Sequence, residues 1–187
     1  MDELLTYLNT IRPLSLPLSD RIERIFTLRR FRTNSFLLRE GDILDQNWFV
    51  VSGLVRCFFV QKDADISRCF LQKDDLLLTD LAFPEGQRSP AYLQALHDST
   101  VLSCSRHEFN RLYHDYPEFE HHGRILIMRC LVRTYAVLDG IRMHSAKERY
   151  LFLEQNFPEL LQSVPHKYLA SYISLHEITL SKIRSNR

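Results

Sequence analysis

The sequence predicts an α+β fold in three parts: an antiparallel β-barrel, one long helix and a small helical unit at the C-terminal end. Between residues 28 and 105, short apolar runs alternate with turn residues, as where 36–38 (FLL) is followed by 40–42 (EGD). Strands this short and this regularly interrupted are typical of a sandwich or barrel. From about 118 to 143, apolar residues instead recur every three or four positions without a proline, which predicts a long helix.

Composition narrows the class of protein. The chain has 187 residues, of which 45% are hydrophobic and 25% charged, as in ordinary globular proteins. No window approaches the roughly 20 apolar residues of a membrane span. The N-terminal end begins with Asp2 and Glu3 rather than with a basic segment, so we expect no secretory signal and a cytoplasmic protein without a membrane partner. The net charge of +1 excludes a chain that binds polyanions over its whole surface.

The four cysteines argue for a reduced compartment and against a metal cluster. No pair is closer than Cys57 and Cys69, so the C-x-x-C spacing of many metal sites is missing. Three of the four lie in apolar segments with a strand-like pattern, where a reduced cysteine packs as a small hydrophobic residue. We therefore expect free thiols.

The N-terminal region is expected to contain two short helices followed by the strands. The helices are predicted over 2–10 and 19–27, the second capped within Leu18-Ser19-Asp20. The turn Ser52-Gly53 separates two of the strands. The predicted strands cover residues 36–38, 48–51, 54–60, 66–71, 75–79, 91–96 and 100–104.

The long helix carries two apolar rows. One row can cover the barrel, so the other needs a partner, and a coiled-coil-like seam between two copies supplies it. A helix simply buried by its own domain is the alternative. The second row comprises Ile127, Leu131, Leu138 and Ile141, and the row predicted to form the homodimer interface comprises Ile125, Met128, Val132 and Tyr135.

The last part of the chain begins with a strong helix signal. Ser145 is expected to cap a helix over 146–156, with Glu148 at the capping-box position, and Phe157-Pro158 ends it. The following segment, 164–184 (VPHKYLASYISLHEITLSKIR), predicts two short helices joined by a tight turn.

This pair of helices has the pattern of a helix-turn-helix. Pro165 suits a first turn, small Ala170 suits the point where the helices cross, and Ile173, Leu180 and Ile183 supply the core. The second helix should meet base edges in the major groove of duplex DNA, and its basic residues should meet phosphates. Residues 142–187 contain seven Lys and Arg and four Glu, a small positive excess. The non-specific affinity for DNA should therefore be low. The predicted DNA-binding residues are His176, Glu177, Ile178, Thr179, Ser181, Lys182 and Arg184.

Three stretches together resemble the Crp/Fnr family of bacterial transcription regulators, namely 39–56 (REGDILDQNWFVVSGLVR), 76–96 (LLLTDLAFPEGQRSPAYLQAL) and 164–184. The resemblance covers nearly the whole chain, and its compact C-terminal part looks most like that of Bacteroidetes-type members. It implies a cyclic-nucleotide-binding-like β jelly-roll sensor over 1–117, a dimerisation helix over 118–143 and a helix-turn-helix domain over 144–187. The implied partners are duplex DNA, a second copy of the chain and RNA polymerase.

In that family the middle stretch is the phosphate-binding cassette, with Gly-Glu-Leu, a short helix, and Arg followed by a small residue. This chain has Thr79-Asp80-Leu81 and Arg88-Ser89 at those places, with a loop about one residue shorter. A β-branched side chain stands where backbone should approach a ligand, and Pro90 removes an N–H donor beside the phosphate pair. No cofactor is assigned; a cyclic nucleotide, another small effector and no ligand all stay open.

Three further departures from the family bear on DNA binding. Ser174 stands at the turn position that is usually Gly, so we expect a strained or reshaped turn. Ile178 replaces a common Glu and offers apolar contact to a thymine methyl, which predicts a site richer in A·T. A chain ending at Arg187 is expected to have no β-hairpin wing.

The resemblance also bears on metal cofactors, because the iron–sulfur members of the family use an N-terminal cysteine cluster. Residues 1–56 contain no Cys, so we expect no iron–sulfur cluster.

Two other classes of function are weighed. An enzyme of the cupin type needs His-x-His on its strands, and none of the eight histidines forms that motif. No G-x-S-x-G or P-loop is present either, so no catalytic or metal-ligating residue is assigned. A dimeric sensor or interaction module that has lost DNA binding is the remaining alternative.

Overall fold

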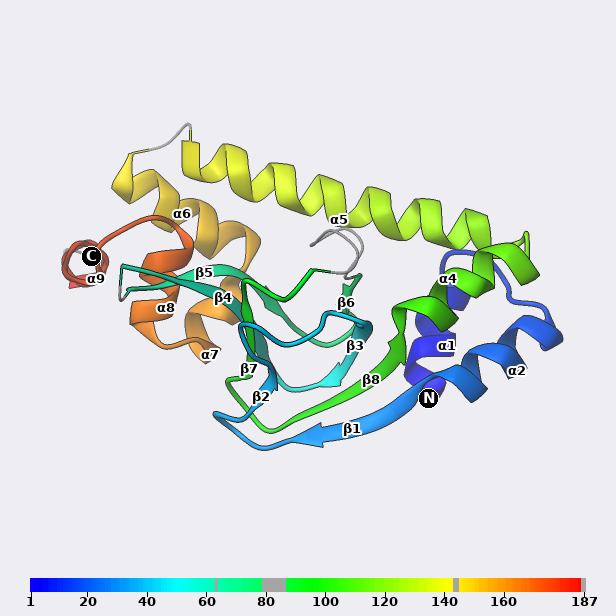
Figure 1. Ribbon diagram of the computed structural model, residues 1–187. Coiled ribbons are helices and arrows are strands. Elements are labelled where there is room, and N and C mark those ends of the chain that lie inside the picture. Colours follow the sequence, from blue (N-terminus) through cyan, green and yellow to red (C-terminus); the bar gives the residue numbers. More distant parts are fainter. Residues whose placement is uncertain (63, 79–86, 143–144, 186–187) are drawn as a thin grey trace. The chain divides into compact units, whose positions relative to one another are not determined.

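A computed structural model of the chain describes residues 1–62, 64–78, 87–142 and 145–185 (Figure 1). The chain forms two compact units. The first comprises Met1–Cys57 and Phe70–Arg129, and the second comprises Phe58–Cys69 and Cys130–Arg187. The second unit thus contains the tip of one β-hairpin in addition to the C-terminal helices.

The described strands form two four-stranded sheets. One has the order β1 (Thr27–Phe31), β8 (Ser99–Ser105), β3 (Gln46–Ser52), β6 (Leu76–Leu77). The other has the order β2 (Phe36–Leu38), β7 (Tyr92–Ala95), β4 (Val55–Gln61), β5 (Ala64–Leu71). Strand β8 pairs antiparallel with β1 and with β3, and β2 pairs antiparallel with β7. Sequence-distant strands therefore meet in each sheet, as in a sandwich rather than a simple meander.

The first sheet is covered on both faces. Four consecutive residues of β3, from Asn47 to Val50, are buried although successive side chains point to opposite faces. One face packs on helices α1 (Asp2–Asn9), α2 (Leu16–Ile25) and α4 (Arg106–Asp115), which contribute Leu4, Ile22 and Phe109 to a core shared with Phe49. The amphipathic helices thus close this side of the sensor sheet.

The N-terminal helices differ in part from the prediction. Helix α2 begins three residues before the predicted start because Ser15, rather than Ser19, accepts the N–H of Leu18 as its cap. A leucine and a proline occupy its first two positions, and proline fits there because it needs no N–H partner. Strand β1 and helix α4 were not predicted. Helix α4 is capped by Ser105 and buries Phe109 and Leu112, a short apolar pattern overlooked in the sequence.

The C-terminal helices follow the predicted pattern except for one short helix over Pro158–Ser163, which was not predicted. The long helix α5 runs over Phe119–Arg142, and residue 143 of the prediction lies outside the described residues. Helix α6 covers Ala146–Asn156 with the full capping box of Ser145 and Glu148. The last three helices are α7 (Pro158–Ser163), α8 (His166–Tyr172) and α9 (Glu177–Ser185). None of the described helices is long and apolar enough to cross a membrane.

Candidate effector loop and nucleic-acid interface

The predicted effector residues that the structure describes are Arg88 and Ser89; Thr79, Asp80 and Leu81 lie outside the described residues. Arg88 is exposed, and its Nη1 donates to the carbonyl of Gly41 at 2.7 Å. The backbone beside it forms a short antiparallel pairing, with Ser89 N–H donating to Asp42 O and Gly41 N–H donating to Ser89 O, each at 2.8 Å. Gly41 has φ +87°, a conformation that glycine adopts without steric cost.

The Ser89 side chain is engaged in its own turn. Its hydroxyl donates to Ala91 O at 2.7 Å and accepts from Ala91 N–H at 3.1 Å, and the residue is buried. Arg88 therefore presents its charge at the surface of the barrel, whereas Ser89 holds the loop in shape. Of these two described residues, Arg88 is the one that suits an anion, because a guanidinium forms short charge-assisted hydrogen bonds with phosphate or carboxylate.

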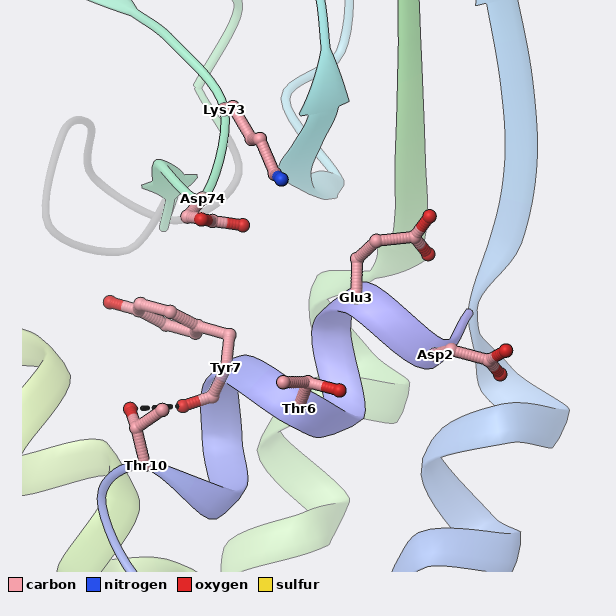
Figure 2. Close-up of a pocket in the computed structure, with 7 residues that line it drawn as sticks. All are labelled: Asp2, Glu3, Thr6, Tyr7, Thr10, Lys73 and Asp74. Carbon is pink, nitrogen blue, oxygen red and sulfur yellow. Dashed lines mark hydrogen bonds between the residues drawn. The ribbon is translucent and has the colours of Figure 1, made fainter.

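A separate hollow lies between helix α1 and the turn that follows β5. It encloses about 310 Å³ and is lined by seven residues, among them Tyr7, Lys73 and Asp74 (Figure 2). Figure 2 shows these side chains around an open gap, with acidic and basic groups mixed. Small-molecule sites are usually enclosed and mainly apolar. Since the hollow is open, is lined by several charged side chains and contains none of the predicted effector residues, we do not assign the effector to it.

Helix α5 exposes a row of large apolar side chains. Met128, Val132 and Tyr135 of the predicted interface are 53%, 65% and 55% exposed, whereas Ile125 is half-buried. Ile127 and Leu131, assigned to the other row from the sequence, are exposed as well. Positions three and four apart lie on one side of a helix, so these residues form one stripe. An apolar stripe of this extent is a feature that a partner usually covers.

Helices α8 and α9 are joined by a tight turn, as the sequence predicted. Ala170, Ile173 and Leu180 are each 0–1% exposed, and Ala170 lies within α8 as the crossing requires. Ser174 has φ +54°, so the left-handed turn is kept with serine in place of glycine. Leu175 N–H donates to Ala170 O at 2.8 Å and Ser174 N–H to Ser171 O at 3.2 Å. This pair of bonds is the Schellman motif, which satisfies the last carbonyls of a helix.

Arg149 on α6 holds the same turn from outside, and sequence reasoning missed it. Its Nη1 donates to the carbonyls of Ser174 at 3.2 Å and Ile173 at 3.4 Å. These partners lie 24 and 25 residues along the chain, a separation at which no local sequence pattern identifies a hydrogen bond. The turn is thus stabilised by its own backbone and by a cation.

The predicted DNA-binding residues extend from the position before α9 to near its last residue, and most of them are exposed. His176, Glu177, Ile178, Ser181 and Lys182 are exposed, with Ile178 60% exposed. Thr179 and Arg184 are half-buried. The N–H of Ile178 donates to His176 Nδ1 at 3.4 Å, and the Arg184 guanidinium lies against His166 Nε2 at the start of α8. Ile178 thus presents an apolar side chain among polar neighbours on the exposed part of α9.

Comparisons with known proteins place these features in a class. Residues 28–116 match the family model of the cyclic nucleotide-binding domain. No curated protein sequence is recognisably similar to the chain. The chain therefore contains a cyclic nucleotide-binding domain, formed largely by the two sheets described above.

Solved structures extend the comparison to the C-terminal helices. FixK2 from Bradyrhizobium japonicum has a TM-score of 0.71 at 15% identity, with 87% of this chain and 84% of that chain covered. The c-di-GMP-responsive global regulator CLP from Xanthomonas campestris has a TM-score of 0.70 at 15% identity, with 92% of this chain and 91% of that chain covered. A Crp/Fnr-family transcriptional regulator from Thermus thermophilus has a TM-score of 0.66 at 16% identity, with 86% of this chain and 84% of that chain covered. The chain has the fold of the Crp/Fnr transcription regulators, and the predicted α+β class is confirmed.

Proposed function

We propose that the chain is a dimeric transcription regulator in which α9 contacts duplex DNA. The observation that carries the proposal is the α8–α9 pair, whose left-handed turn and buried Ala170 and Leu180 present one side of α9 outward. Recognition helices of this motif enter the major groove at their N-terminal ends. The fold shared with Crp/Fnr regulators supports the same assignment.

The DNA site follows from the chemistry of α9. Ile178 offers only apolar contact, which suits a thymine methyl group. Lys182 is exposed one turn further on and is suited to a phosphate. We expect half-sites that are richer in A·T than the G/C half-sites familiar in the family, and about one helical turn, roughly 34 Å, apart.

A selection from random duplexes with the full-length chain tests DNA binding directly. Lys182→Ala should weaken binding to all selected duplexes alike and reduce the slope of log Kd against log salt concentration by about one. Lys147→Ala, which removes an exposed charge from α6, is the matched control and should leave Kd unchanged. Ile178→Ala should relax the preference for A·T. If no duplex is bound at low salt, the chain is the alternative dimeric interaction module.

We propose that the apolar stripe of α5 forms the homodimer seam that such a DNA site requires. Val132→Glu should convert the protein to a monomer in sedimentation experiments, because two carboxylates would be buried opposite each other. Cys130→Glu is the control, since Cys130 is exposed but lies outside the stripe on the helical wheel. A Val132→Glu variant that stays dimeric would move the seam elsewhere.

For the barrel, we propose a test that separates a cyclic nucleotide from the two alternatives, another small effector and no ligand. Titration calorimetry with cyclic AMP and cyclic GMP is that test. A binding heat that disappears in Arg88→Ala would identify a cyclic nucleotide held by the guanidinium beside Gly41. The absence of heat with both nucleotides would exclude cyclic AMP and cyclic GMP and leave another effector or no ligand.

A further inference from the structure

A closed set of hydrogen bonds joins strand β5 to helix α8 within the second unit. Ser67 N–H donates to Ser171 Oγ at 2.9 Å, and Ser171 Oγ donates to Ser67 Oγ at 2.8 Å. Ser67 Oγ then donates to the carbonyl of Tyr168 at 3.0 Å. Each hydroxyl gives one proton and accepts one hydrogen bond in this scheme, and Ser67 is 5% exposed. We call these three residues the serine junction.

The junction satisfies the open edge of a sheet. Strand β5 is the last of the described strands in the order β2-β7-β4-β5, so it forms an edge of this sheet. An unpaired edge usually invites association with another chain unless something covers it. Here the α8 side chain accepts the Ser67 N–H, and the hairpin tip (Phe58–Cys69) groups with the C-terminal helices (Figure 1). The edge strand and α8 therefore behave as one body.

Through α8 the junction reaches the recognition helix. Ser171 lies one turn before the tight turn at Ser174, which the Schellman bonds and Arg149 hold rigid. A shift of Ser171 would therefore carry α9 with it. In the other direction, β4 and β5 continue beyond Cys57 and Phe70 into the sheet of the first unit. The hairpin thus links the sensor sheet to α8 through hydrogen bonds, whereas α5 links the same parts through the covalent chain.

We propose that Ser67 is a positioning residue for DNA binding: a side chain of the sensor sheet that sets the place of α8 and hence of the recognition helix. The inference rests on the proposed function. A helix held in its binding position loses less freedom when it docks, so the junction should favour the complex. The three residues lie outside the predicted DNA-binding set, so loss of the junction should change affinity without removing a predicted phosphate contact.

The test uses the full-length chain with Ser67→Ala and Ser171→Ala, measured against a selected duplex. Ser67→Ala should raise Kd about fivefold, the usual net effect of one lost hydrogen bond. Ser171→Ala should raise Kd further, because it leaves the buried Ser67 N–H without its acceptor. Neither variant should alter the salt slope that Lys182→Ala reduces. Ser67→Thr, which keeps the hydroxyl, should restore affinity.

Ser163→Ala is the matched control, because Ser163 makes a comparable serine-to-carbonyl bond, to Glu159 O at 2.6 Å, on α7 away from the hairpin. Amide hydrogen exchange without DNA should show faster exchange in α8 for Ser67→Ala and not for the control. Unchanged or tighter DNA binding by Ser67→Ala, with the wild-type chain binding normally, overturns the inference alone. A wild-type chain that binds no duplex overturns the proposed function and the inference with it.

Discussion

The strain at Ser174 leads to a quantitative prediction. A left-handed backbone costs an L-residue about 1–2 kcal/mol, because Cβ crowds the following carbonyl. Glycine removes that cost. Its unfolded chain has more conformational freedom to lose on folding, however, which lowers the stability by about 0.5–1 kcal/mol. Ser174→Gly should therefore stabilise the helix-turn-helix by about 0.5–1 kcal/mol and raise Tm by a few degrees, on the scale of roughly 2–4 °C per kcal/mol. Both Schellman hydrogen bonds use backbone atoms and survive the substitution.

Thermal and urea unfolding of matched variants test this reasoning. Ser174→Ala keeps Cβ at the same φ of +54° and should bring no stabilisation. Ser163→Gly, at the C-terminal residue of α7, should destabilise, because glycine is a poor helix former. If Ser174→Gly is no more stable than Ser174→Ala, the turn is not strained and the argument from its backbone fails.

Further predictions concern the core, a close helix contact and the thiols. Leu180 has 0% exposure, so Leu180→Ala should lower the free energy of unfolding, measured in urea, by about 2–5 kcal/mol. An alanine substitution at an exposed position of α9 should lower it by less than about 0.5 kcal/mol. Gly140→Ala places a methyl group 2.6 Å from the Phe152 ring and should lower Tm despite the higher helix propensity of alanine, which an increase would contradict. Iodoacetamide should modify exposed Cys130 in the folded protein. Burial raises the pKa of the Cys104 thiol well above its usual range, so Cys104 should stay unmodified up to pH 9 until the protein unfolds, and early labelling in peptide mass spectra would refute this.

The C-terminal region shows which features local sequence is able to predict. The capping box of Ser145 and Glu148 and the buried Ala170 and Leu180 depend on neighbours within a few positions. Spacing therefore carries their signal. Helix α4 was not predicted, although its cap at Ser105 is an equally local signal. Its buried residues are few and its sequence is mostly polar, so its apolar pattern is weak.

The loop of Arg88 and Ser89 shows where such prediction stops. The sequence predicted the two residues as a phosphate pair by resemblance, but only the fold shows that the guanidinium meets Gly41 and that the serine hydroxyl serves its own turn. Gly41 lies 47 residues away in the chain. Which residue meets an arginine across such a distance depends on strand pairing and not on local pattern.

By itself, the sequence determined the α+β class, the long helix with its apolar rows and the paired C-terminal helices, since periodicity and capping act over one or two turns. Tertiary structure alone decided that the β4–β5 hairpin groups with the C-terminal helices, that Arg149 holds the turn before α9, and that Ser67 meets Ser171. These contacts join segments 24 to 104 residues apart. Hydroxyl and carbonyl groups are present throughout any chain, so only the packing of the folded backbone selects which of them meet.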